Sequence, residues 1–149
     1  MNILKEFNNW SMANILARWT LGIVFLMAGF WKVFELTAIE HARQYFVEAY
    51  AETWIPAWLL WVLGLAIPYL EFLAGMFLIA GLRVRNTVSV LGVLLLITTY
   101  GHLLKQPLFD IDGHTFTRLA LVIFLLIAPN RNDILSVDYW IGKNVKSEK

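Results

Sequence analysis

The chain carries an acidic residue in the middle of a long apolar segment. Glu71 interrupts the run from Ala57 to Ala80, which contains no other charged residue. A run of this length can cross a bilayer, since a membrane helix needs about 20 apolar residues. A carboxylate near the centre of such a span costs about 2.5–3.5 kcal/mol on insertion scales, so it must face the protein interior and find a partner. We therefore expect a polar site inside a membrane bundle.

Two cations in the preceding apolar segment could pair with Glu71. Arg18 and Lys32 lie on one helical face, and small residues share the face of each charged group. These small residues are Gly22 and Gly29 in the first segment and Gly64 and Gly75 in the second. Glycines would let the two helices approach closely and enclose Glu71 between them. We expect Arg18 to be the partner, because a guanidinium binds a carboxylate bidentately and tolerates burial better than an ammonium. Lys32 is the second choice.

Pro68 precedes Glu71 by three residues in the same segment. Proline has no N–H, so it leaves a carbonyl near Gly64 without its usual helical partner and favours a kink.

A second polar cluster is expected toward the opposite end of the bundle from the termini. Lys32, Tyr100, His102 and Arg118 should lie at similar depth, and their donors could hold an anionic or quinone-like head group. Simpler roles are open for three of them. Lys32 and Arg118 could reach the membrane surface with their long side chains, and His102 could be a solvated structural residue. Glu71 could serve only to fix the register of the helices.

Several kinds of chemistry are excluded by composition. The chain has no cysteine, so it cannot use thiol exchange, thiolate-bound iron–sulfur clusters or a cysteine nucleophile. It contains no phosphate-binding glycine loop, zinc-binding His-Glu pair or nucleophile elbow. The Asp-x-Asp-Gly sequence at residues 110–113 lacks the remaining ligands of a calcium loop, so we expect no metal site.

The elements that must position these residues are four membrane helices. We expect spans over residues 16–34, 57–80, 87–104 and 115–128, followed by a short interfacial helix over residues 133–146. The fourth span is the shortest and needs Arg118 to lie paired or at its end. Residues 1–149 then form a single domain with an all-α fold, a four-helix transmembrane bundle. A soluble helical bundle is the alternative, but the second and third segments lack the polar stripe that it requires.

Composition and charge place this bundle in a membrane. Hydrophobic residues make up 59% of the chain and charged residues 15%, against about 45–50% and 25% in soluble domains. Eight Lys and Arg residues fall on the side of the termini and four on the other, so we expect both termini in the cytoplasm. The acidic connection from residue 35 to 56 would then face outward. The net charge of +1 argues against a nucleic-acid partner.

The chain resembles the DoxX family of small four-helix membrane proteins. The residues that carry the resemblance are Arg18-Trp19-Thr20-Leu21-Gly22, Phe25, Ala28-Gly29, Lys32, Pro56, Glu71-Phe72-Leu73-Ala74-Gly75, Gly81-Leu82-Arg83-Val84-Arg85 and Leu135-Ser136-Val137-Asp138. The last of these lies near a Ser-x-Asp ending that is frequent in the family. The resemblance implies a four-helix membrane bundle in the bacterial cytoplasmic membrane and an association with redox systems.

Two functions from different classes follow. The first is a membrane subunit or anchor of a quinone-linked oxidoreductase assembly, with the bilayer, a soluble redox enzyme or a second copy of the chain as partners. In this function Glu71 and Arg18 form a buried charge pair, and Lys32, Tyr100, His102 and Arg118 bind the head group. The second is a non-catalytic scaffold or small-solute permease. Residue types alone leave both open, and quinone is the cofactor that the first implies.

Overall fold

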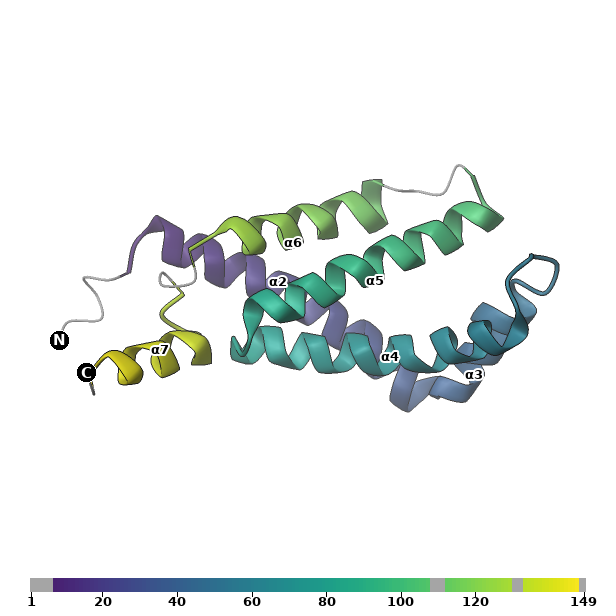
Figure 1. Cartoon of the computed structure of the whole chain (residues 1–149), viewed down its shortest axis with the longest axis horizontal. Coiled ribbons are helices and arrows are strands. Elements are labelled where there is room, and N and C mark those ends of the chain that lie inside the picture. Colours follow the sequence, from purple (N-terminus) through teal and green to yellow (C-terminus); the bar gives the residue numbers. More distant parts are fainter. Residues whose placement is uncertain (1–6, 108–111, 130–132, 148–149) are drawn as a thin grey trace.

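The computed structural model describes residues 7–107, 112–129 and 133–147, and every element within these ranges is helical. Three long helices form the body of the molecule, α2 (Asn9–Phe30), α4 (Ala57–Ala80) and α5 (Val84–Lys105) (Figure 1). The shorter elements are η1 (Trp31–Glu35), α3 (Ala38–Ala42), η2 (Arg43–Glu48), η3 (Asp112–Phe116), α6 (Thr117–Ile127) and α7 (Val137–Ser147). The expected all-α class is confirmed, and the second expected span matches α4 at both ends.

The first helix begins earlier than the hydrophobic pattern indicates, at Asn9 rather than at residue 16. A capping box sets its start. The Asn8 side chain accepts a hydrogen bond from the backbone N–H of Ser11, and the Ser11 hydroxyl accepts one from the N–H of Asn8. The helix continues without a break through η1, which gives one helical stretch over Asn9–Glu35.

Glycines set the distance between α2 and α4. A Cβ added at Gly29 would lie 2.3 Å from the backbone nitrogen of Phe72, and one at Gly75 would lie 2.4 Å from that of Leu26. Nothing larger than glycine fits where two helix backbones approach this closely. The expected packing of the two glycine faces is therefore confirmed at these positions. Gly64 differs, because its nearest neighbour is Ala42 of α3.

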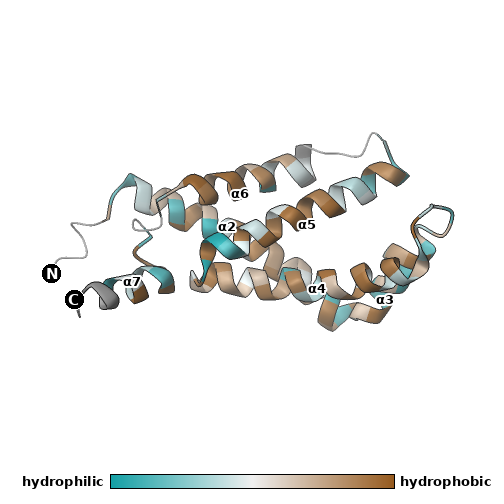
Figure 2. Cartoon of the chain, viewed as in Figure 1, coloured by the Kyte–Doolittle hydropathy of each residue, from teal (hydrophilic) through white to brown (hydrophobic). Residues whose placement is uncertain are grey.

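Three helices are long and apolar enough to cross a membrane, namely Asn9–Glu35, Ala57–Ala80 and Val84–Lys105. The fourth expected span corresponds to α6, a shorter apolar helix with η3 before it. Figure 2 shows apolar residues along the long helices and polar ones gathered nearer their ends. Exposed large apolar side chains cover these helices, including Leu16, Ile23, Met27, Val62, Val93 and Leu96. A surface of this kind is stable in lipid, and the protein is a membrane protein.

The connection from α2 to α4 is itself structured. Within the acidic connection, η1, α3 and η2 form a helical layer that packs against the first half of α4 (Figure 1). Ala42 is fully buried there and His41 is 5% exposed. The start of α2 and the helix α7 lie at the opposite end of the molecule from this layer. Each of these ends holds one of the polar sites described below.

Candidate functional site

Glu71 pairs with Lys32. The ammonium of Lys32, in η1, lies 2.6 Å from a carboxylate oxygen of Glu71, in α4. The Glu71 side chain is 9% exposed and that of Lys32 is 22% exposed. Arg18, the expected partner, is bonded to other groups. The expected Arg18–Glu71 pair is therefore wrong, and the second choice is the one that forms.

The register of the two helices explains why Lys32 is the partner. Gly29 packs against Phe72, so Lys32, almost one turn further along the same helix, lies level with Glu71. Arg18 lies fourteen residues before Lys32, which is about 21 Å along a helix axis. A guanidinium suits a carboxylate better than an ammonium does, but that preference cannot compensate for such a separation.

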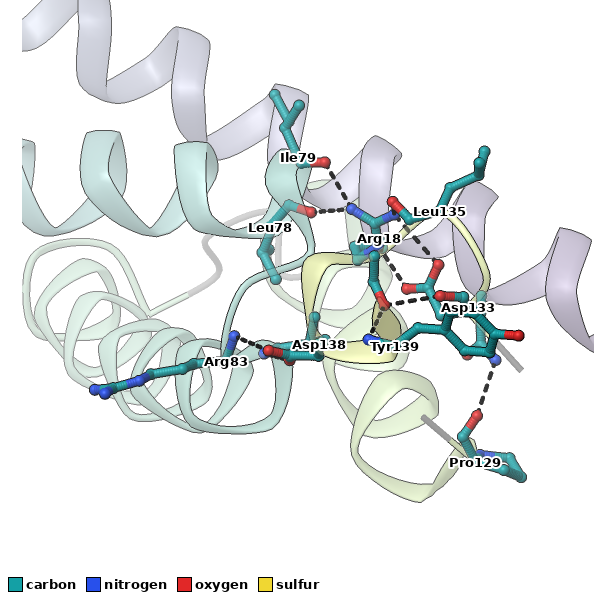
Figure 3. A network of polar contacts seen from close by, with 12 residues as sticks. Arg18, Leu78, Ile79, Arg83, Pro129, Asp133, Leu135, Asp138 and Tyr139 are labelled. Atoms are coloured by element: carbon teal, nitrogen blue, oxygen red, sulfur yellow. Dashed lines mark hydrogen bonds and ion pairs between the residues drawn. The ribbon is translucent and has the colours of Figure 1, made fainter. Parts of the chain in front are cut away.

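Arg18 is fully buried and uses all of its donor capacity. Its Nε and one terminal nitrogen donate to the two carboxylate oxygens of Asp133, at 2.7 and 3.3 Å (Figure 3). The same terminal nitrogen donates to the carbonyl of Leu135 at 3.2 Å. The other terminal nitrogen donates to the carbonyls of Leu78 and Ile79, the latter at 2.7 Å. We call this arrangement the Arg18 network. It joins α2 to the end of α4 and to the segment before α7.

Residues 133–136 form part of this network and do not belong to an interfacial helix. The expected helix over residues 133–146 begins only at Val137, because Asp133 and Ser136 turn inward and are buried. The Ser136 hydroxyl donates to the carbonyl of Asp133 at 2.7 Å and accepts from the N–H of Tyr139 at 3.1 Å. Ser136 thus caps the first turn of α7.

Asp138 caps a different helix. Its two carboxylate oxygens accept hydrogen bonds from the N–H groups of Arg83 and Val84, both at 2.8 Å (Figure 3). Its own N–H donates to the carbonyl of Gly81 at 3.0 Å. The negative charge at the start of α5 also interacts favourably with the helix dipole. The Ser-x-Asp sequence at residues 136–138 therefore has a structural role at the turn between α4 and α5.

That turn needs a glycine. Gly81 adopts φ +70°, and its N–H and that of Leu82 bond back to the last turn of α4 in a Schellman arrangement. A Cβ at Gly81 would lie 2.4 Å from the Cβ of Ser136. Arg83 also has a positive φ, +47°. The carboxylate of Asp138 holds the N–H of Arg83 in this uncommon backbone conformation.

The opposite end of the molecule contains a cavity of about 360 Å³. We call it the aromatic pocket. It is bounded by Lys32, the α3–η2 layer, the start of α4 and the end of α5. Its lining residues are Lys32, His41, Tyr45, Phe46, Tyr50, Trp54, Ile55, Leu59, Leu60, Leu63, Ile67, Ile97, Thr98, Tyr100, Gly101 and His102. An apolar, aromatic lining with a few polar groups is typical of a small-molecule site.

Most of the residues expected to bind a head group meet in this pocket. Lys32, Tyr100 and His102 line it. Glu71 is linked to it through Lys32. Arg118 is not among the lining residues, although it lies close enough to Glu71 to interact with it electrostatically. Arg18 belongs to the other end of the bundle. Residues 110 and 111 of the expected non-binding Asp-x-Asp-Gly loop lie outside the described residues.

His41 is the pocket residue that sequence reasoning missed. Its Nδ1 lies 2.8 Å from the carbonyl oxygen of Gly64. This is the carbonyl that Pro68, four residues later, leaves without a helical donor, because proline has no N–H. The freed carbonyl at Gly64 was the available signal. It requires a donor from another element, and His41 supplies it.

Burial affects the ionisation of two pocket residues outside the spans. Burial lowers the pKa of His41 below its usual value, an effect that the charge of Lys32 reinforces and the bond to Gly64 opposes. Burial also raises the pKa of the Tyr50 phenol. The imidazole and the phenol are therefore both neutral near pH 7. The pocket offers the Lys32 ammonium as a donor and neutral aromatic groups around it.

Comparison with known proteins agrees with the resemblance in sequence. The DoxX family model matches residues 13–103, more than half of the chain. No curated protein and no solved structure matched the chain. The matched segment contains Arg18, Lys32, Glu71 and all of the side chains that line the aromatic pocket. The chain therefore belongs to the DoxX family.

Proposed function

We propose that this protein is the membrane subunit of a quinone-linked oxidoreductase assembly and that the aromatic pocket holds the quinone head group. The observation that carries the proposal is the pocket itself. Its volume, about 360 Å³, lies within the usual range for small-molecule sites, about 300–1,000 Å³. Tyrosine, phenylalanine and tryptophan rings around a flat conjugated ring provide stacking, and Lys32 provides a charged donor for a carbonyl oxygen.

The Lys32–Glu71 pair favours an uncharged ligand. The carboxylate balances the charge of the ammonium at 2.6 Å, so the pair contributes no net charge to the site. A quinone is neutral and carries two carbonyl acceptors. An ammonium has three N–H donors, and one of them serves Glu71. Lys32 can therefore bond to a ligand oxygen without losing its partner.

The placement in the membrane is part of the proposal. We place both termini in the cytoplasm, the Arg18 network at the cytoplasmic end of the bundle and the aromatic pocket near the outer surface of a bacterial cytoplasmic membrane. The excess of Lys and Arg on the side of the termini supports this orientation. In this placement, helical residues 112–127 would serve as the fourth span. At about 24 Å they are short of the hydrocarbon thickness, so Arg118 lies near its end and reaches toward the head groups.

A soluble redox enzyme, or a second copy of the chain, would complete the assembly. The non-catalytic alternative, a scaffold or small-solute permease, differs in a measurable way. Mass spectrometry of the intact protein from mild detergent reads both bound small molecules and subunits. A copurifying quinone supports the proposal, whereas solute flux in liposomes without bound quinone supports the alternative.

A direct binding test uses ubiquinone-1, a short-chain quinone, with the purified protein in detergent. Trp54 lines the pocket, so a bound quinone should quench its fluorescence, and Trp54→Phe should remove that part of the signal. The double variant Lys32→Gln/Glu71→Gln removes the donor without leaving an unpaired charge. A hydrogen bond from a charged group contributes about 1.5–3 kcal/mol, so affinity should fall by about 10- to 100-fold.

Arg85→Gln is the matched control, since Arg85 is an exposed cation at the start of α5 and is not among the residues that line the pocket. It should leave the affinity unchanged. If wild-type protein shows no saturable quenching by ubiquinone-1, the aromatic pocket is not a quinone site.

A further inference from the structure

His41 has a fixed orientation and a fixed tautomer. Its Nδ1 lies 2.8 Å from the Gly64 carbonyl oxygen, and a carbonyl can only accept, so Nδ1 carries the hydrogen. The ring also packs against Tyr45 and Phe46, with centroids 5.6 and 5.4 Å away. Pro68 favours the arrangement, because the residue whose N–H would ordinarily bond to this carbonyl is a proline and has none.

The other ring nitrogen of His41 is therefore an acceptor. In a neutral imidazole, the nitrogen without a hydrogen presents a lone pair. Burial and the nearby Lys32 charge keep the ring neutral by lowering the pKa of His41. The side chain is part of the pocket lining. A donor on a ligand is the natural partner for this lone pair.

Lys32 and His41 offer opposite hydrogen-bonding chemistry in the same pocket. The ammonium donates and accepts nothing, whereas the imidazole Nε2 accepts. A quinone has only carbonyl acceptors, so it satisfies Lys32 but leaves Nε2 without a partner. A hydroquinone has two hydroxyl groups. Each hydroxyl can both donate and accept, so one can accept from Lys32 while the other donates to His41.

We propose that His41 is a specificity residue that makes the aromatic pocket prefer the reduced, hydroxyl-bearing form of the quinone couple. This inference rests on the proposed function, since it concerns the same pocket and ligand class. It assigns to His41 a role in binding and requires no electron transfer within this chain. A site built to hydrogen-bond a hydroxyl discriminates strongly against an analogue that lacks it, because its polar group is then left unpaired.

The test compares the affinities of ubiquinone-1 and ubiquinol-1 for the same protein under anaerobic conditions at pH 7.5. Wild-type protein should bind the reduced form about tenfold more tightly. His41→Asn keeps an amide N–H for the Gly64 carbonyl but removes the Nε2 acceptor, and it should abolish the preference. A tenfold change in relative affinity corresponds to about 30 mV in the midpoint potential of the bound couple. Tyr69→Phe, on α4 and not among the pocket-lining residues, is the control and should leave the preference intact.

A second measurement does not depend on how well the variant folds. The chain has three histidines, so ¹⁵N spectra of the ring nitrogens can be assigned. The His41 Nε2 resonance should show the shift of an unprotonated nitrogen and should move when ubiquinol-1 is added, but not when ubiquinone-1 is added.

The outcomes separate the two proposals. Binding of both forms with a preference that His41→Asn removes supports the inference. Binding of both forms with equal affinity, or an Nε2 resonance unmoved by ubiquinol-1, overturns the inference and leaves the quinone site in place. If neither form binds to wild-type protein, the proposed function fails and the inference fails with it.

Discussion

Removing the charge of Asp133 should destabilise the protein strongly. Asp133→Asn preserves the shape of the side chain but leaves the fully buried Arg18 guanidinium without a counter-charge. Breaking a buried pair in this way costs about 3–5 kcal/mol. In this variant the Arg18 guanidinium keeps two hydrogen bonds to carbonyls in the last turn of α4. The helix dipole contributes roughly half a negative charge there, which partly balances the guanidinium. We therefore expect the lower end of the range, about 3 kcal/mol.

A double-mutant cycle isolates the interaction between the two residues. Arg18→Met alone leaves a buried carboxylate and should cost at least as much as Asp133→Asn. Combining the two removes both charges, so the double variant should be more stable than the sum of the single losses predicts. We expect a coupling of at least about 2 kcal/mol, measured by reversible unfolding in mixed detergent micelles with circular dichroism.

Two comparisons make this cycle specific. Asp138→Asn is the same substitution five residues later, and it weakens only a helix cap, so it should cost about 1 kcal/mol. A second cycle pairs Arg18→Met with Glu71→Gln. These residues have different partners in the structure, so their effects should add within about 0.5 kcal/mol. Strong coupling in this second cycle, with none between Arg18 and Asp133, would refute the assignment of partners.

Three further predictions concern packing, pH and orientation. Gly29→Ala should destabilise the bundle by about 1–3 kcal/mol, because the added Cβ would lie 2.3 Å from the backbone nitrogen of Phe72. Gly142→Ala is the control in the same unfolding assay. A Cβ added there would meet no neighbouring heavy atom within 4 Å, so this variant should stabilise α7 by up to about 1 kcal/mol. Burial lowers the pKa of His41 in the folded state, so the unfolded chain binds the proton more readily. Thermal stability should therefore be full at pH values above the ordinary histidine pKa of 6.5, and it should fall as the pH drops below that value. His41→Asn should remove this pH dependence. Tags near either terminus should be protected in intact cells and a tag at Glu48 should be accessible, since eight Lys and Arg residues lie on one side and four on the other; an accessible carboxyl-terminal tag would overturn the proposed orientation.

The sequence predicts the central packing well because its signals are local. Helical spacing of glycines identified the contact between α2 and α4, and an apolar run with Glu71 as its one charged residue defined α4 to the residue. Lys32, Tyr100 and His102 were grouped by estimating depth along each helix. Depth estimates are reliable when helices are straight and antiparallel, and all three residues do line one pocket.

Partners that are distant in sequence could not be found this way. Asp133 lies 115 residues from Arg18, in a stretch whose mixture of apolar and charged residues is typical of a membrane surface. Nothing in its neighbours distinguishes a buried aspartate from an exposed one. The sequence does contain one signal of the α3–η2 layer, since Ala42 and Phe46 are four residues apart and share a helical face. The acidic residues around them nevertheless favoured an exposed connection.

The Arg18 network has a consequence for how the protein is made. The arginine enters the membrane with helix α2, whereas the aspartate that neutralises it is synthesised 115 residues later. During synthesis the Arg18 guanidinium must therefore remain hydrated or near the lipid phosphates while the following helices are inserted. The native arrangement can close only after the residues that follow α6 have been synthesised. A chain cut short before residue 133 would retain an uncompensated charge in its first helix, which gives membrane proteases a physical feature by which to distinguish unfinished copies from finished ones.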